Sequence, residues 1–309
     1  MISPAHTAPA DCPSLLVKLG PDPRDVFDAG APVLAGDACE TLFFPALRTG
    51  QAGALSLYRD GEWLLGAASV SLHDGLETAS RRLYADIFRA VHGLHLARIW
   101  NYVPGINEAG PGGLENYRLF CRARSLAFEQ HHGPGFKAVL PAASAVGAKS
   151  AVLTTLFAAS QTRPRHVENP LQVSAYDYPN EYGPRAPSFA RASLVSAPGG
   201  DTVFISGTAA IRGHASVAPG ELLPQLTCSL ENLREISAAC GLGPDLDRAG
   251  RRARAFKVYL RYAADQPRVA AILQDQLLTP ADRVSYLHAD ICRAELLVEI
   301  EATLFAPEK

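Results

Sequence analysis

Two glutamates interrupt an apolar stretch near the end of the chain, CRAELLVEIEATLF at residues 292–305. The stretch is typical of a buried strand, in which Glu299 and Glu301 point to the same face because side chains alternate with a period of two. A carboxylate buried without a partner costs on the order of several kcal/mol. One of the two can line a pocket while the other pairs with an arginine, and burial can then leave a proton available near neutral pH for a general acid. A salt bridge to a neighbouring arginine explains the pattern equally well.

The segment YLHADICR offers a second candidate, a nucleophile pair of His288 and Cys292. A small thiol that lines a core or a pocket is the simpler interpretation of Cys292. His131 and His132 end a predicted helix, where the helix dipole favours histidine, and no third metal ligand is evident. The loop GPGGLENY lacks the spacing of nucleotide-binding loops. We therefore predict neither a metal site nor a cofactor.

Several arginines fall on elements that a two-fold repeat would bring near one another, although each of them taken alone is more often a surface residue. They are Arg122, Arg124, Arg185, Arg191, Arg261 and Arg283. Guanidinium groups bind carboxylates through two-point contacts. A long segment at residues 162–200, rich in Pro, Tyr and Arg, adds Tyr176, Tyr178 and Tyr182, and long ordered loops are often functional. Together these side chains indicate a site for a small polyanion, whereas the formal net charge of −2 gives no general attraction to nucleic acid or to an anionic membrane.

The periodicity of apolar residues predicts two halves with one order of elements: strand, strand, helix, strand, helix, strand, strand. The predicted helices are residues 76–92, 115–132, 221–241 and 267–277. The predicted strands are GALSLYRD, EWLLGAASV, LARIWNYV and SAVLTTLFAA in the first half, and PLQVSAYDY, DTVFISGTAAI, RAFKVYLRY, VSYLHADI and LLVEIEATLF in the second. Each half is then an α+β unit with two helices on one face of a mixed sheet. We place the domain boundary between residues 161 and 162, which gives domains 1–161 and 162–309.

The two halves also share a faint residue pattern. KSAVLTTLFA at 149–158 aligns with VEIEATLFA at 298–306 on the common Leu-Phe-Ala. In this alignment Ala151 stands opposite Glu299 and Leu153 opposite Glu301. A strand needed only for packing is expected to look like the first copy, so the carboxylates of the second copy indicate a function that the first copy lacks.

The sequence also predicts the cellular location of the protein. Residues 138–160 are long enough to cross a membrane, but Pro141, Gly147 and Lys149 interrupt them, so we predict a loop followed by a buried strand. The N-terminus shows no basic segment before an apolar run, which argues against a signal peptide. The six cysteines form no CxxC pair and no disulfide spacing. We expect a cytoplasmic protein with reduced thiols.

Several motifs resemble known families. LLVEIEATLF, with Arg283 about sixteen residues before Glu299, resembles the C-terminal signature of the reactive-intermediate deaminases (RidA), and FISGTAAI followed by Gly213 and His214 resembles their first-strand motif. A longer resemblance, from about residue 96 to the end, is to the chorismatases. It is carried by IWNYVPGIN, GLENYRLFCRARSLAF, NPLQVSAYDYPNEYGPRAPSFARA and YLHADICRAELLVEIEA. The resemblance implies two tandem RidA/chorismate-mutase-like domains, a degenerate one in the first half and one that carries the catalytic Glu in the second.

The resemblance also implies roles for individual residues. Glu299 matches the acid that protonates the enol-ether methylene of chorismate, and Cys292 matches the position at which a Cys accompanies hydroxybenzoate products. Tyr117, Arg124 and Tyr176 lie in matching motifs and are expected to bind the substrate. Arg283 matches the carboxylate-binding Arg of the deaminases. Arg261 is added from its place on a predicted strand.

We therefore predict a chorismatase that releases pyruvate and 3-hydroxybenzoate, with some 4-hydroxybenzoate as a further product. Alternatives are a chorismate hydrolase that yields a trans-dihydrodiol, an imine or enamine deaminase, and a sensor that binds a carboxylate metabolite without turnover. The expected partner is the small molecule chorismate rather than nucleic acid or membrane. We expect the chain to be a monomer or a small homo-oligomer.

Overall fold

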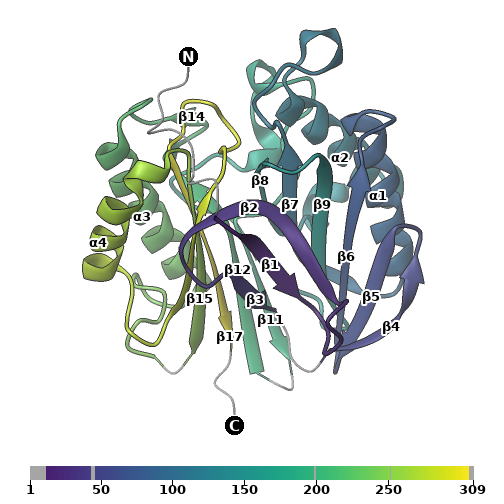
Figure 1. Cartoon of the computed structure of the whole chain (residues 1–309), viewed down its shortest axis with the longest axis horizontal. Coiled ribbons are helices and arrows are strands. Elements are labelled where there is room, and N and C mark those ends of the chain that lie inside the picture. The colour runs from purple at the N-terminus through teal and green to yellow at the C-terminus, as the bar shows by residue number, and fades with distance from the viewer. Residues whose placement is uncertain (1–11, 43–45, 198–199, 251, 306–309) are drawn as a thin grey trace.

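Four layers, helices–sheet–sheet–helices, make up the computed structural model (Figure 1), which describes residues 12–42, 46–197, 200–250 and 252–305. Helices α1 (Leu76–Ala90) and α2 (Asn116–His132) cover the outer face of one sheet. Helices α3 (Leu222–Cys240) and α4 (Gln266–Gln276) cover the outer face of the other. All four predicted helices are confirmed, and the fold is of the predicted α+β class. No helix in the described ranges is long and apolar enough to cross a membrane.

The two sheets share one strand order. The six-stranded sheet runs β4 (Leu47–Ala52), β5 (Leu55–Asp60), β6 (Trp63–Ser71), β9 (Val152–Ser160), β7 (His95–Pro104), β8 (Ala142–Ala148). The nine-stranded sheet begins in the same way with β10 (Arg165–Val167), β11 (Ala192–Ala197), β12 (Gly200–Ala209), β17 (Val298–Phe305), β15 (Ala253–Leu260), β16 (Arg283–His288). In both sheets the last two of these strands pair in parallel and the other pairs are antiparallel. Strands β9 and β17 therefore occupy equivalent places, as the shared Leu-Phe-Ala predicts.

The nine-stranded sheet ends with strands from the start of the chain. They are β2 (Val26–Gly36), β1 (Ser14–Lys18) and β3 (Cys39–Thr41). Strand β2 pairs antiparallel with β16, so residues 14–41 belong to the sheet of the second half rather than to the first. The boundary at residues 161 and 162 thus follows the repeat but not the sheets, and the division into domains 1–161 and 162–309 stays a prediction.

The structure corrects two predicted segments. Residues 170–178 do not form a strand: Ala175–Asp177 is a 3-10 turn, and the backbone N–H groups of Asp177 and Tyr178 bond to carbonyls three residues earlier. Pro170 and Pro179 flank the segment and have no N–H to offer a sheet. Within 138–160, the predicted loop contains β8, whose side chains are all buried and small, so that they show no alternation for a sequence pattern to detect.

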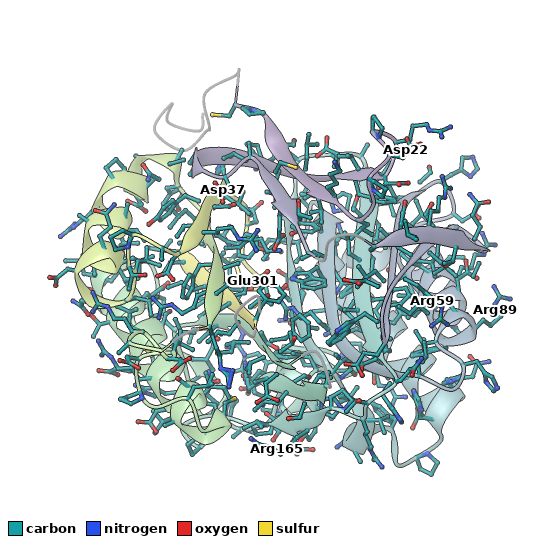
Figure 2. The ribbon with its side chains drawn as sticks, turned by 90° about the horizontal axis from the view of Figure 1, so that it is seen from below. Asp22, Asp37, Arg59, Arg89, Arg165 and Glu301 are labelled. Atoms are coloured by element: carbon teal, nitrogen blue, oxygen red, sulfur yellow. The ribbon has the colours of Figure 1, made fainter. Side chains whose placement is uncertain are left out.

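Aromatic side chains from both sheets meet in the space between them. Phe204 of β12 meets Trp63 at a ring-centroid distance of 5.9 Å and Trp100 at 6.0 Å. These residues belong to a core cluster shared by both sheets. Figure 2 shows Glu301 in the interior of the molecule, whereas Asp22 and Arg89 lie at its edge. The strand with the two glutamates thus runs through the centre of the fold.

Candidate active site

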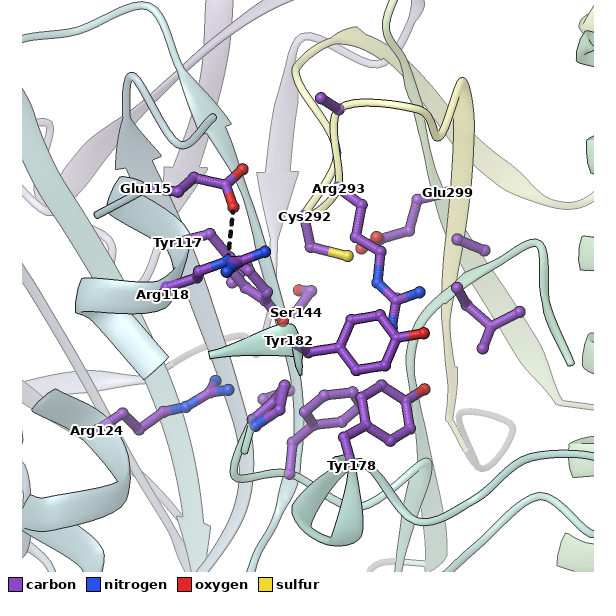
Figure 3. Close-up of a pocket in the computed structure, with 18 of the residues that line it drawn as sticks. Glu115, Tyr117, Arg118, Arg124, Ser144, Tyr178, Tyr182, Cys292, Arg293 and Glu299 are labelled. Carbon is purple, nitrogen blue, oxygen red and sulfur yellow. Dashed lines mark ion pairs between the residues drawn. The ribbon is translucent and has the colours of Figure 1, made fainter. Parts of the chain in front are cut away.

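A cavity of about 350 Å³ lies where the two halves meet. Its walls come from α2, β8 and the loop before β11 on one side, and from β12, β17 and the loop before β17 on the other. Figure 3 shows side chains from these elements converging, with Tyr117 and Arg124 from α2 facing Cys292 and Glu299. The volume falls within the range of about 300–1,000 Å³ that is usual for small-molecule sites.

Glu299 reaches this cavity through a gap in the neighbouring strand. The pairing of β12 with β17 shifts register between Ile205 and Thr208, and Gly207 lies in that irregularity. A Cβ atom at Gly207 would lie 1.8 Å from Oε1 of Glu299. The absence of a side chain at Gly207 therefore makes room for the carboxyl group.

The carboxyl of Glu299 is isolated from the protein's other polar groups. It is 3% exposed, and among the described residues none forms a hydrogen bond or ion pair with it. Burial, reinforced by the negative charge of Glu301, raises its pKa to about 8, although Arg98 and Arg191 act in the opposite direction. Glu299 is therefore protonated at neutral pH and can donate a proton.

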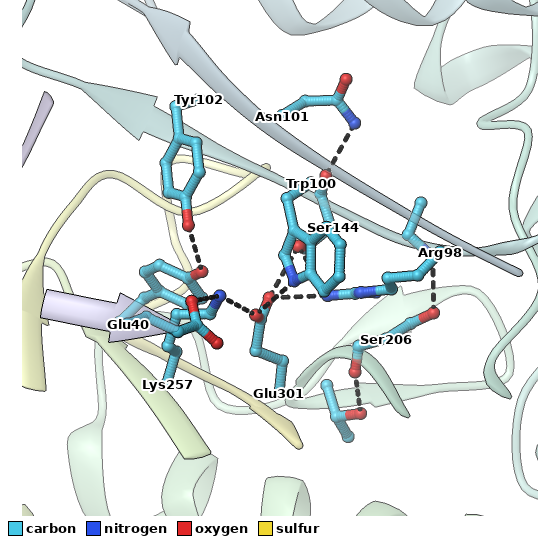
Figure 4. Close-up of polar contacts among 12 residues, drawn as sticks. Glu40, Arg98, Trp100, Asn101, Tyr102, Ser144, Ser206, Lys257 and Glu301 are labelled. Carbon is cyan, nitrogen blue, oxygen red and sulfur yellow. Dashed lines mark hydrogen bonds and ion pairs between the residues drawn. The ribbon is translucent and has the colours of Figure 1, made fainter. Parts of the chain in front are cut away.

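Glu301 has the opposite environment (Figure 4). Its carboxylate accepts hydrogen bonds from Arg98 at 2.7 Å, Ser144 at 2.7 Å and Trp100 at 2.9 Å, and lies 3.0 Å from Nζ of Lys257. Burial acts to raise the pKa of Glu301, but Lys257 and Arg98 outweigh it and the pKa is lowered. The two glutamates therefore differ in charge state: Glu301 is an ion-paired carboxylate, and Glu299 is a protonated acid that faces the cavity.

Three arginines of the cavity wall lack an acidic partner. Arg124, Arg191 and Arg293 line the cavity, and no carboxylate of the described residues lies within ion-pair distance of them. Arg124 is 1% exposed and Arg191 is 7% exposed. Arg191 donates a hydrogen bond to the hydroxyl of Tyr178, and Arg293 donates to Ser216 and to the carbonyl oxygen of His214, but these acceptors are neutral. A buried guanidinium whose charge is not neutralised is costly, so the charges indicate that the cavity takes an anion.

Cys292 lines the same cavity as a neutral thiol. Burial and the neighbouring Glu299 raise its pKa to about 12, whereas a nucleophilic cysteine needs a lowered pKa. His288 does not line the cavity, and its Nε2 lies 3.1 Å from the carbonyl oxygen of Arg261. The Cys–His pair considered from the sequence is therefore not formed.

The structure brings four of the seven predicted site residues together. Glu299, Cys292, Tyr117 and Arg124 all line the cavity. Burial raises the pKa of Tyr117 well above its ordinary value, so its phenol stays protonated and can donate a hydrogen bond.

The other three lie elsewhere. Tyr176 packs against the first-half core, with Nζ of Lys137 at 5.8 Å from its ring centre. Arg261 pairs with Asp290 at 2.7 Å and donates to the carbonyl oxygens of Leu296 and Arg293, so it holds the loop before β17 rather than a ligand. Arg283 is exposed and lines a second cavity of about 760 Å³, formed by α4, β16 and β2. Arg283 therefore does not line the cavity that Glu299 faces.

Some cavity residues were not singled out by the sequence analysis. Arg293 and Ser144 were missed, although Arg293 directly follows Cys292 in the matching motif. Of the six grouped arginines, Arg122 and Arg185 pair with Glu77 and Glu129 instead. Within the described ranges, no three His, Cys, Asp or Glu side chains are arranged to hold a metal ion.

Known proteins resemble this chain over most of its length. The family model described as chorismatase FkbO/Hyg5-like, N-terminal, matches residues 44–159. A 3-hydroxybenzoate synthase of Streptomyces hygroscopicus is 35% identical, over 82% of this chain and 77% of the relative. A chorismatase of Streptomyces rapamycinicus is 37% identical, over 83% and 78%. A crystal structure of a chorismatase superposes with a TM-score of 0.76 and 32% identity, over 84% of this chain and 80% of the other.

Proposed function

We propose, because this chain belongs to the chorismatase family, that it removes the enolpyruvyl side chain of chorismate as pyruvate and leaves 3-hydroxybenzoate. The observation that carries the proposal is the carboxyl of Glu299, whose pKa is raised to about 8 and which is buried beside a cavity that contains three arginines without an acidic partner. Such a group holds its proton at neutral pH and can deliver it to a carbon atom.

The first chemical step is protonation of the enol ether. Glu299 gives its proton to the vinyl CH₂ carbon, which becomes a methyl group, and positive charge develops on the ether carbon and oxygen. The bond between this oxygen and ring carbon C3 then breaks, with its electron pair moving to the oxygen, and the side chain leaves as pyruvate. Glu299 ends the step as a carboxylate.

The second step decides the product. In the proposed route the ring hydroxyl oxygen at C4 bonds to C3, and its proton returns to Glu299. The arene-oxide-like species opens and aromatises to 3-hydroxybenzoate. Chorismate then equals 3-hydroxybenzoate plus pyruvate atom for atom, without water, whereas the dihydrodiol route consumes one water. Cys292, an uncharged thiol in the cavity, supports the first route because its sulfur occupies space beside the ring that water would otherwise fill.

Chorismate is a dianion with one carboxylate on the ring and one on the side chain. Arg124, Arg191 and Arg293 supply the positive charge that such a ligand needs. Arg191 is the one of the three whose charge acts on the pKa of Glu299. We therefore assign the side-chain carboxylate to Arg191, because the vinyl carbon must lie next to the acid, and the ring carboxylate to Arg124 or Arg293.

Incubation of the purified protein with chorismate tests the proposal. Pyruvate is measured with lactate dehydrogenase, and the ring products are separated by chromatography. We expect one pyruvate for each hydroxybenzoate, with 3-hydroxybenzoate as the main ring product and 4-hydroxybenzoate as the minor one. Pyruvate with only a dihydrodiol would assign the chain to the hydrolytic branch, and binding of chorismate without pyruvate would favour a sensor.

A further inference from the structure

Guanidinium groups and aromatic rings alternate along one wall of the cavity. The order is Phe120, Arg124, Phe189, Arg191, Tyr178, Arg293, Tyr182, and successive distances from guanidinium carbon to ring centre are 5.1, 5.9, 5.0, 5.9, 5.4 and 4.0 Å. All of them except Phe120 line the cavity. The row combines residues of α2, of the loop before β11 and of the loop before β17.

Two rings of this row each contact two guanidinium groups, Phe189 and Tyr178. The hydroxyl of Tyr178 also accepts a hydrogen bond from Arg191 at 2.7 Å, whereas Phe189 contacts its two arginines through the ring alone. Arg124 is 5.9 Å and Arg191 5.0 Å from its ring centre. Both arginines are buried, and the Nε atom of each lacks a hydrogen-bond partner among the described residues. Two unpaired cations with nothing between them would repel each other, and the electron-rich face of a ring attracts a cation within about 6 Å.

An acidic side chain at this place would also hold the two arginines. It would, however, cancel their charge, and a ligand carboxylate would have to displace it. A ring attracts each guanidinium without neutralising it, and it makes no hydrogen bonds that compete with the ligand. The N–H groups without a protein acceptor, among them Nε of both arginines, therefore stay available for a carboxylate, whereas Nη2 of Arg191 donates to the hydroxyl of Tyr178.

Resting on the proposed function, we propose that Phe189 is a positioning residue for chorismate. It holds the guanidinium groups of Arg124 and Arg191 in separate, uncancelled positions, so that a dianion meets two pre-formed cationic sites. Phe189 itself does no chemistry in this scheme, so its electronic character affects substrate binding and leaves the chemical step unchanged.

The test replaces Phe189 by phenylalanines with one, two and three ring fluorines. Fluorine withdraws electrons and weakens the attraction for a cation, while the shape of the ring changes little. We expect KM for chorismate to rise with each fluorine, to about ten-fold for the trifluoro ring, with kcat within two-fold of the wild-type value.

Two ordinary substitutions and a control position complete the test. Phe189→Leu should have the KM of the trifluoro protein, and Phe189→Tyr should have a KM near that of the wild type. The same fluorinated series at Phe128, a buried core ring that contacts Phe88 and Tyr84 instead of an arginine, is the matched control and should leave KM unchanged.

The outcomes separate this inference from the proposed function. Wild-type protein that releases pyruvate but shows a flat KM across the fluorinated series overturns the role of Phe189 alone. A fall of kcat at constant KM overturns it as well, because that result would mean a disturbed acid rather than disturbed binding. If the wild type releases no pyruvate, the proposed function fails. Calorimetric Kd values of chorismate for the same proteins then decide the inference: a rise with each fluorine supports it, and no rise or no binding ends it.

Discussion

Two carboxyl groups on one strand have opposite protonation states at neutral pH. Glu299 and Glu301 are separated by one residue, and both side chains are buried. The pKa of Glu299 is nevertheless raised and that of Glu301 is lowered. The difference lies in the partners, since Glu301 has two cations and Glu299 has none. Glu301 also helps to keep Glu299 protonated, because its fixed negative charge makes a second negative charge on Glu299 costly.

Glu299→Gln is predicted to abolish pyruvate release, because the amide keeps the size of the side chain but has no acidic proton to give. It is also predicted to stabilise the protein. With a pKa of about 8 in place of the ordinary 4.5, folded Glu299 binds more protons than unfolded Glu299 between these values, so the free energy of unfolding declines as pH rises through that window. The amide lacks this penalty. Thermal unfolding at pH 8 should give a higher Tm for the variant than for wild type, and residual turnover in the variant would remove Glu299 from its role.

The pH dependence of kcat/KM follows from the same group. Only the protonated form of Glu299 is active, so kcat/KM should decline ten-fold per pH unit above a pKa near 8. Below pH 7 the profile should be flat with respect to this group. The measurement is pyruvate release at subsaturating chorismate between pH 6 and pH 10. A rate that rises through this range would mean that a base, rather than an acid, limits the reaction.

Cys292→Ala is predicted to change the product more than the rate. The thiol is neutral, with its pKa raised to about 12, so its loss removes volume and no nucleophile. The smaller side chain leaves room for water beside the ring, and a share of the product should become dihydrodiol. Chromatography of the ring products measures the share. Pyruvate release within ten-fold of wild type is expected, and complete inactivity would instead indicate a chemical role for the sulfur.

At the scale of elements, the sequence predicts the helices and strands whose apolar residues follow a regular period. The four helices follow from their 3.6-residue period, and the face shared by Glu299 and Glu301 follows from the period of two in β17. The same reasoning finds Arg124 and Tyr117, because they lie on a helix of a recognisable motif. It does not find β8, where every residue is small and buried, nor the sheet position of residues 14–41, which depends on a pairing with β16 far along the chain. The spacing of Arg283 and Glu299 along the chain likewise does not reveal that Arg283 lines a different cavity, because that depends on how β16, α4 and β2 pack.

Glu301→Gln is predicted to lower both the free energy of unfolding of the protein and the pKa of Glu299. Both effects would come from one carboxylate on β17, so the stability of the fold and the acidity of Glu299 are coupled. The change leaves Arg98 and Lys257 buried without their shared anion, and breaking a buried ion pair costs about 3–5 kcal/mol. It also removes a negative charge next to Glu299, so the pKa of Glu299 should fall and the alkaline decline of kcat/KM should begin at a lower pH. Urea unfolding and the pH profile measure the two effects.

Glu129→Gln is the control for this variant. Its half-exposed pair with Arg185 lies at the surface, where an ion pair contributes about 0–1 kcal/mol. Equal destabilisation by both changes, or an unchanged pH profile in the Glu301 variant, would contradict the coupling.

At the scale of the whole molecule, the two halves share the cavity and a buried network of charges. Glu301 comes from the second half, whereas Arg98, Trp100 and Ser144 that bind it come from the first. Lys257 continues the network to Glu40 at 2.6 Å, on the N-terminal strands that extend the second sheet. Neither half can bury these charges alone, so we expect the halves to fold as one cooperative unit.

The tryptophans allow a direct test of this cooperativity. The chain has only two, Trp63 and Trp100, and both lie in the six-stranded sheet against Phe204 of the other sheet. Their fluorescence therefore reports the contact between the sheets, whereas far-ultraviolet circular dichroism reports all helices and strands. We expect the two signals to change together in urea, with a single midpoint.

Phe204→Ala should lower the free energy of unfolding by about 3–5 kcal/mol, because it leaves a cavity between the sheets, and both signals should move to the same lower midpoint. A fluorescence change at a lower urea concentration than the circular dichroism change would mean that the sheets separate while each half stays folded. The cavity would then lie at an interface between two independently folded halves, and the prediction of one cooperative unit would be wrong.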